Sequence, residues 1–199
     1  MAERRPSAPA LVWAGVAALM GLAALALHRL DPTLIDWQPA LATREPWRAW
    51  SAVFVHYSGL HLAANLAGAV LVGALGAVAR VPARSLAAWL AAWPLTQFGL
   101  ALQPALLHYG GLSGVLHAGV AVVVVHLLCH GNPRQRRIGI AMFAGLALKV
   151  ASESPWGAPL RHPPGWDIAV APLAHASGAL AGALCAGVAE ALHRRSVLR

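Results

Sequence analysis

Six long apolar stretches alternate with short polar or proline-containing breaks along the chain. They lie at about Ala10–His28, Leu60–Ala79, Ser85–Gln103, Ser113–His130, Ile138–Ser152 and Pro172–His193. Most approach the roughly 20 residues that a helix needs to cross the hydrocarbon core, and a helix satisfies all the backbone polar groups of a single span in lipid. The pattern therefore predicts an all-α membrane protein with six transmembrane helices.

The composition supports this interpretation. Of the 199 residues, 58% are apolar and only 11% are charged, whereas charged residues make up roughly a quarter of an average soluble domain. The spans leave little chain for anything else, so we expect a single domain over residues 1–199. The first stretch follows Arg4 and Arg5 as in a signal peptide, but no small-residue cleavage site follows it, so we interpret it as a retained span.

The positions of the charges predict the orientation of the chain. The net charge is +8, and the cytoplasmic side is assigned ten arginines and two glutamates: Arg4, Arg5, Arg80, Arg84, Arg134, Arg136, Arg137, Arg194, Arg195, Arg199, Glu3 and Glu190. The basic and acidic residues of the other side balance, so the entire excess lies on one side, as the positive-inside rule requires. We therefore expect cytoplasmic termini, the lipid bilayer as partner and no nucleic-acid partner.

Polar side chains inside the predicted spans gather at one depth. The second, fourth and sixth spans all run from the outside to the inside, and near their outer ends stand His61 with Asn65, Ser113, and His175. Polar groups in lipid are costly and normally face the interior of a helix bundle. Their convergence from three separate spans therefore indicates a functional site.

Ser113 and His175 carry the side chains of a nucleophile and its base. Ser113 follows Gly110, Gly111 and Leu112 in a turn at a helix start, where unpaired backbone N–H groups can stabilise an anion. An imidazole, with a pKa of about 6.5, can take a hydroxyl proton at neutral pH. The alternatives are that Ser113 only caps its helix, and that His175 is a structural hydrogen-bonding residue or belongs to a proton pathway.

His61 and Asn65 are four residues apart and therefore lie on one face of the second span. Both carry N–H donors that can surround a developing oxyanion, which completes the roles that a peptide-cleaving site needs. The alternative is that they hydrogen-bond between helices and hold the bundle together. No aspartate is placed to orient His175, because Asp167 lies too far toward the outside.

These residues resemble the motifs of the rhomboid family of intramembrane serine proteases. In chain order they are Trp47-Arg48, His56, His61-xxx-Asn65, Gly111-Leu112-Ser113-Gly114 and Ala174-His175-xx-Gly178, within residues 47–182. The resemblance implies the six-transmembrane-helix rhomboid fold, a catalytic dyad of Ser113 and His175, and oxyanion contacts from His61, Asn65 and the Ser113 amide. It also implies a water-filled cavity open to the outside, and neither a cofactor nor a metal ion.

Within the family, the small size and the Gly-Leu-Ser-Gly-Val-Leu-His run that begins at Gly111 look most like the rhombosortases. That resemblance implies membrane-anchored protein substrates with a C-terminal sorting tail, made of a Gly-Gly-containing motif, a hydrophobic helix and a basic end. It also implies cleavage at the periplasmic face of a bacterial inner membrane. A general housekeeping rhomboid protease is the alternative within the family.

The roles of several neighbouring residues stay open. Housekeeping rhomboids usually have a tyrosine that packs on the base at the position of His117, and this histidine either keeps the packing role or competes for the proton. Gly111, in the turn before Ser113, is an accessory candidate. Lys149 and Glu153 are four residues apart and are interpreted first as an ion pair, with substrate docking by Glu153 as the alternative.

Two functions other than proteolysis are also open. A rhomboid-like protein can hold membrane clients as a chaperone without cutting them, but such relatives usually lack the serine or the histidine, and this chain has both. The ten histidines are also compatible with a proton or ion pathway. Five of them lie near span ends, however, and form no chain across the membrane: His108, His126, His130, His162 and His193.

Overall fold

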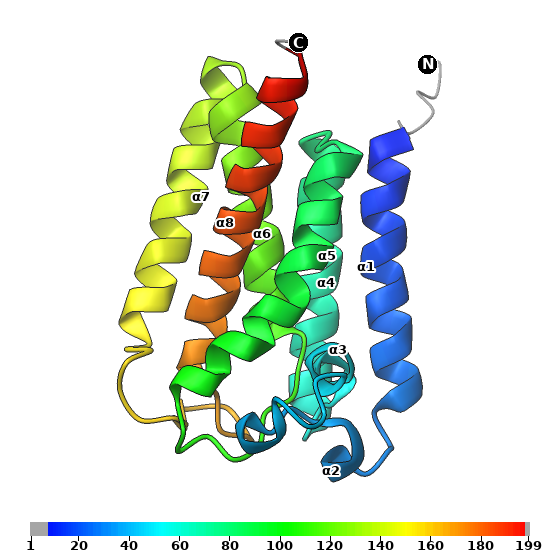
Figure 1. Cartoon of the computed structure of the whole chain (residues 1–199), viewed down its shortest axis with the longest axis vertical. Coiled ribbons are helices and arrows are strands. Elements are labelled where there is room, and N and C mark those ends of the chain that lie inside the picture. The colour runs from blue at the N-terminus through cyan, green and yellow to red at the C-terminus, as the bar shows by residue number, and fades with distance from the viewer. Residues whose placement is uncertain (1–7, 198–199) are drawn as a thin grey trace.

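The computed structural model describes residues 8–197 and has six long helices that run alongside one another (Figure 1). They are α1 (Ala8–Leu27), α4 (Gly59–Val78), α5 (Ala83–Phe98), α6 (Ser113–His130), α7 (Pro133–Ser152) and α8 (Pro172–Val197). Between residues 8 and 197 the only β-type pairing is in two isolated bridges, so the predicted all-α membrane fold is confirmed. Glu3, Arg4, Arg5 and Arg199, which entered the charge assignment, lie outside the described residues.

Five of these helices are long and apolar enough to cross a membrane, namely α1, α4, α6, α8 and α5 with its extension η3 (Gly99–Leu102). α7 begins five residues before its predicted start, because a capping box between Asn132 and Gln135 starts the helix ahead of its apolar part. It thereby takes in three arginines and is less apolar than the other five. Its apolar part still exposes Phe143 and Leu148, while basic residues near both ends can reach toward the headgroups.

α6 lies at the centre of the bundle and contacts α4, α5, α7 and α8. Its approach to α8 depends on glycine, because a methyl group added at Gly178 would overlap the Gly114 carbonyl and one at Gly182 would overlap the Ala118 carbonyl. Small residues allow such contact between helix backbones in lipid. This contact fixes the first turn of α6 against the first turn of α8.

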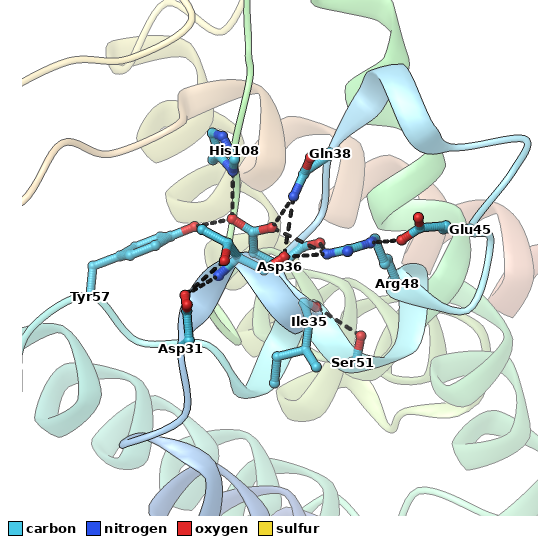
Figure 2. Close-up of polar contacts among 10 residues, drawn as sticks. Asp31, Ile35, Asp36, Gln38, Glu45, Arg48, Ser51, Tyr57 and His108 are labelled. Atoms are coloured by element: carbon cyan, nitrogen blue, oxygen red, sulfur yellow. Dashed lines mark hydrogen bonds and ion pairs between the residues drawn. The ribbon is translucent and has the colours of Figure 1, made fainter.

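The segment between α1 and α4 folds over one end of the bundle, called the outer end below (Figure 1). It contains α2 (Pro32–Ile35), η1 (Pro39–Leu41), α3 (Arg48–Ser51) and η2 (Ala52–Phe54). At its centre the buried Asp36 carboxylate accepts hydrogen bonds from Gln38, Tyr57 and His108 and pairs with Arg48 (Figure 2). Asp36 thus joins the chain that enters α4 to the chain that enters α6.

Candidate active site

Ser113 and His175 lie side by side although they are 62 positions apart in the chain. Ser113 is the first residue of α6 and His175 lies in the first turn of α8. The Nε2 atom of His175 is 3.0 Å from Ser113 Oγ, and His175 is 6% exposed. This is a hydrogen-bond distance at which an imidazole can take the proton of a hydroxyl nucleophile.

The turn before Ser113 requires glycine at position 111. Gly111 has a φ of +123°, a conformation that residues with a side chain rarely adopt, and its N–H donates to the Ala52 carbonyl. The N-cap of α6 is Leu112, so the alternative that Ser113 itself is the N-cap is wrong. As at any helix start, the first N–H groups of α6 have no acceptor within the helix, and they lie directly at Ser113.

His61 and Asn65, both in α4, lie against this turn. A methyl group added at Gly111 would be 2.6 Å from His61 Nε2 and 3.4 Å from Asn65 Nδ2. Both side chains are buried, and within the described residues neither His61 Nδ1 nor Asn65 Nδ2 has a hydrogen-bond partner. A buried polar group without a partner lowers the stability of the folded protein by about 1–3 kcal/mol. Unpaired polar groups beside a candidate nucleophile therefore favour a role in binding a substrate oxygen.

His117 packs directly on His175. The two rings are stacked, with centroids 4.2 Å apart and planes 12° apart. His117 Nδ1 donates to the Ser113 carbonyl at 2.7 Å, because a carbonyl oxygen can only accept. This geometry fits the packing role better than competition for the Ser113 proton. Tyr109, which the sequence analysis missed, places its hydroxyl 3.5 Å from Ser113 Oγ, and no periodicity marked this loop residue.

Glu153 makes the expected ion pair with Lys149 and also a contact that the sequence analysis missed. Its Oε2 atom is 2.6 Å from His175 Nδ1. Burial acts to raise the pKa of Glu153, but the hydrogen bonds and charges of His175 and Lys149 outweigh it and lower this pKa to about 2, so the carboxylate is ionised at neutral pH. Asp167 instead accepts a hydrogen bond from Ser58 at 2.8 Å.

The residues of the candidate site line one cavity of about 610 Å³. Ser113, His175, His61, Asn65, His117, Lys149 and Glu153 all line it. Away from the polar groups its wall is apolar and comes from α4, α6 and α7, with Leu71, Leu75, Val120 and Met142 among the lining side chains. The segment 153–171 supplies further lining residues, including Leu160 and Trp166. The cavity can therefore hold an apolar segment with its end at Ser113.

A second cluster of titratable groups lies near the opposite end of α6. His126, His130 and Glu190 bring one potential metal-ligand atom each within 4.8 Å of the others. The Arg84 guanidinium is 3.4 Å from both His130 Nε2 and Glu190 Oε1. Its positive charge would repel a metal cation bound at the same place. We therefore interpret this cluster as an ion-pair network that ties α5, α6 and α8 together.

The chain matches the model of a known protein family. Residues 43–190 match a family model described as Rhomboid domain, which covers well over half of the chain. The matched residues include Ser113, His175, His61, Asn65 and Glu153. No curated protein matches the chain.

Proposed function

Because this chain belongs to the rhomboid family of intramembrane serine proteases, we propose that it cleaves membrane protein substrates with Ser113 as nucleophile and His175 as general base. The whole chain acts as a single rhomboid-type domain. The observation that carries the proposal is the 3.0 Å contact between His175 Nε2 and Ser113 Oγ in a cavity with an apolar wall.

In the proposed reaction, Ser113 Oγ attacks the scissile carbonyl carbon while its proton moves to His175 Nε2. The π electrons of the carbonyl move to its oxygen and give a tetrahedral oxyanion. When this species collapses, the C–N bond breaks, Nε2 gives its proton to the leaving nitrogen, and an acyl ester remains on Ser113. Water then adds to the ester and loses a proton to Nε2. The second collapse returns that proton to Ser113 and releases the new carboxyl end.

The oxyanion is assigned to donors from α4 and α6. Asn65 Nδ2 and a His61 ring nitrogen supply two of them, and the Ser113 amide at the start of α6 supplies a third. The proposal is supported by the position of both side chains against Gly111 and by the missing hydrogen-bond partner of Asn65 Nδ2 within residues 8–197. Donors placed before the reaction begins stabilise the transition state without reorganising.

The proposed substrates are exported proteins anchored in a bacterial inner membrane by a C-terminal sorting tail with a Gly-Gly motif. Both termini of the enzyme then lie in the cytoplasm and Ser113 faces the periplasm. The cavity supports this assignment, because its deep wall of leucine, valine and methionine side chains suits a hydrophobic tail. A general rhomboid protease that ignores the tail is the second candidate, since it would use the same catalytic residues.

Substitution of the two catalytic residues tests the proposal. Ser113→Ala and His175→Ala should each abolish cleavage of a co-expressed client with a Gly-Gly tail, while insertion and melting temperature stay near those of the wild type. A fluorophosphonate probe should label the wild type and neither variant. A correctly inserted Ser113→Ala variant that still cuts at the same bond would contradict the assignment. A wild type that binds the client but is neither labelled nor active would favour the non-cleaving chaperone.

A further inference from the structure

Building on the proposed protease function, we propose that Glu153 is a third member of the site. It acts as a positioning residue whose carboxylate holds the His175 ring with Nδ1 protonated and Nε2 facing Ser113. The site is then a serine, histidine and glutamate triad, with its members supplied by α6, α8 and the residue that follows α7.

The two contacts of His175 carry this inference. Nδ1 lies 2.6 Å from Glu153 Oε2 and Nε2 lies 3.0 Å from Ser113 Oγ. A neutral imidazole carries one proton, and only the tautomer with that proton on Nδ1 leaves Nε2 able to accept from the serine. An ionised carboxylate can only accept, so it selects that tautomer. Hydrogen bonds to an ionised group are shorter than neutral ones, in keeping with the 2.6 Å distance between Nδ1 and Oε2.

Glu153 is itself held in place and kept ionised by its neighbours. Lys149, one helical turn earlier, pairs with Oε1, while Arg161 Nη1 donates to the Glu153 main-chain carbonyl at 2.9 Å. These contacts leave Oε2 for His175. The pKa of Glu153, lowered to about 2, keeps the carboxylate charged over the whole range in which an imidazole is an effective base.

The charge of Glu153 also has a use during the reaction. His175 becomes an imidazolium when it accepts the Ser113 proton, and a carboxylate on Nδ1 stabilises that positive charge. Within residues 8–197, His117 and Ser113 also contact His175, but neither supplies this charge. The His117 ring stacks on the face of the imidazole, and the Ser113 hydroxyl is hydrogen-bonded to Nε2. Glu153 thus contributes to orientation before proton transfer and to charge balance afterwards, and it acts through His175.

Two substitutions of Glu153 in the purified full-length protein test this role. Glu153→Gln keeps the size of the side chain but offers an N–H donor that can stabilise the wrong tautomer. It should lower kcat by about 10²–10⁴-fold, in line with the loss of the carboxylate in other triads, while KM changes by less than about threefold. Glu153→Asp keeps the charge on a shorter side chain and should be intermediate. The rate of fluorophosphonate labelling at Ser113 should fall in parallel, because labelling also depends on His175 as base. Labelling needs no client, so it is independent of substrate binding.

Chemical rescue separates positioning from a structural role. Formate is a small carboxylate that can enter the space vacated in Glu153→Ala, so it should restore part of the labelling rate with saturation, and it should do nothing for His175→Ala or the wild type. Asp31→Asn is the matched control, because it removes a carboxylate at the same end of the bundle and leaves an amide that can still cap α2. Its kcat should equal that of the wild type.

The outcomes distinguish the triad from the protease function on which it rests. If Glu153→Gln keeps kcat within about threefold while Ser113→Ala is inactive, the triad is wrong and the dyad stands. If Glu153→Gln loses activity only in proportion to its loss of folded protein, and formate rescues nothing, Glu153 is structural and the triad is again wrong. If Ser113→Ala is as active as the wild type, the proposed function fails together with the triad.

Discussion

Asn65 carries an amide nitrogen that is buried and unpartnered within residues 8–197, beside the turn that leads to Ser113. An orphaned donor destabilises a folded protein unless it is used by a ligand. Its position predicts that the donor is used when a carbonyl oxygen becomes negatively charged next to it.

Asn65→Ala should therefore lower kcat more than it lowers the melting temperature. Removal of one oxyanion donor typically costs about 10²–10³-fold in rate, and we expect the lower end because His61 and the Ser113 amide share the charge. The buried Gln97 also has amide atoms without a partner in the described part of the chain, but it does not line the cavity. Gln97→Met is therefore the control with near-normal kcat. Clear loss of stability in Asn65→Ala with normal turnover would show that the amide serves helix packing.

At this scale the sequence predicted the residues that belong to motifs and missed those that do not. Ser113 and His175 were found because each lies at the outer end of a predicted span, so their depth followed from helix geometry. Glu153 also lies at a span end, but Lys149 at helical spacing predicted an ion pair first, and substrate docking was the only alternative. The second carboxylate oxygen became relevant only when three-dimensional packing placed His175 2.6 Å away.

Among the elements, the contact between α6 and α8 determines whether the site exists. Both helices contribute a member of the pair in their first turn, and the separation of the two backbones there is set by Gly114 and Gly178. A side chain at either glycine would push Ser113, the proposed nucleophile, away from His175. Packing and chemistry therefore depend on the same glycines.

Gly178→Ala should accordingly destabilise the protein by about 1–3 kcal/mol, a typical cost of overpacking, and should lower the rate of Ser113 labelling in the fraction that remains folded. Gly187→Ala is the matched control in the same helix. A methyl group there meets nothing within 4 Å, and alanine is the better helix former, so stability should be unchanged or slightly higher. Thermal melts and probe labelling in the same detergent would check both. Equal behaviour of the two variants would contradict the packing account.

The positions of the helices followed well from hydropathy, whereas the irregular segments did not. Most span boundaries agree with the observed helices within a few residues, since the apolar length that crosses lipid is itself the physical constraint. α7 starts early because Asn132 and Gln135 form a capping box, which hydropathy does not register. The short helices before α4 are organised by the buried Asp36 carboxylate, a tertiary contact that leaves no periodic pattern.

For the molecule as a whole, the shape of the cavity bears on which substrates are cut. The proposed catalytic groups lie at its outer end. Its remaining wall is apolar, without a charged side chain among the deep lining residues of α4 and α6. Such a wall recognises hydrophobicity rather than a particular side-chain order. We therefore expect selectivity to come from the backbone of the client near the scissile bond.

Replacing both glycines of a client tail with alanine should stop processing, whereas shuffling its apolar residues at constant hydrophobicity should change the rate little. Glycine lacks a Cβ, so its backbone can approach Ser113, and it disfavours a continued helix by about 1 kcal/mol relative to alanine. Mass analysis of the new C-terminus in co-expressing cells would measure both. Cleavage of the glycine-free client at the same place, with failure of the shuffled one, would favour a general rhomboid protease.

The chain of contacts from Lys149 through Glu153 to His175 links α7 to α8, two helices that stand on neighbouring sides of α6 (Figure 1). α7 also forms part of the cavity wall. Binding of an occupant that favours a different position of α7 is therefore coupled energetically to the orientation of the His175 ring. Such a coupling is reciprocal, so each event affects the other by the same free energy. With the proposed triad, a client that moves α7 also changes the orientation of His175, and a His175 ring held in place opposes that movement. In such an enzyme the affinity for a bulky tail and the speed of bond cleavage cannot be tuned independently.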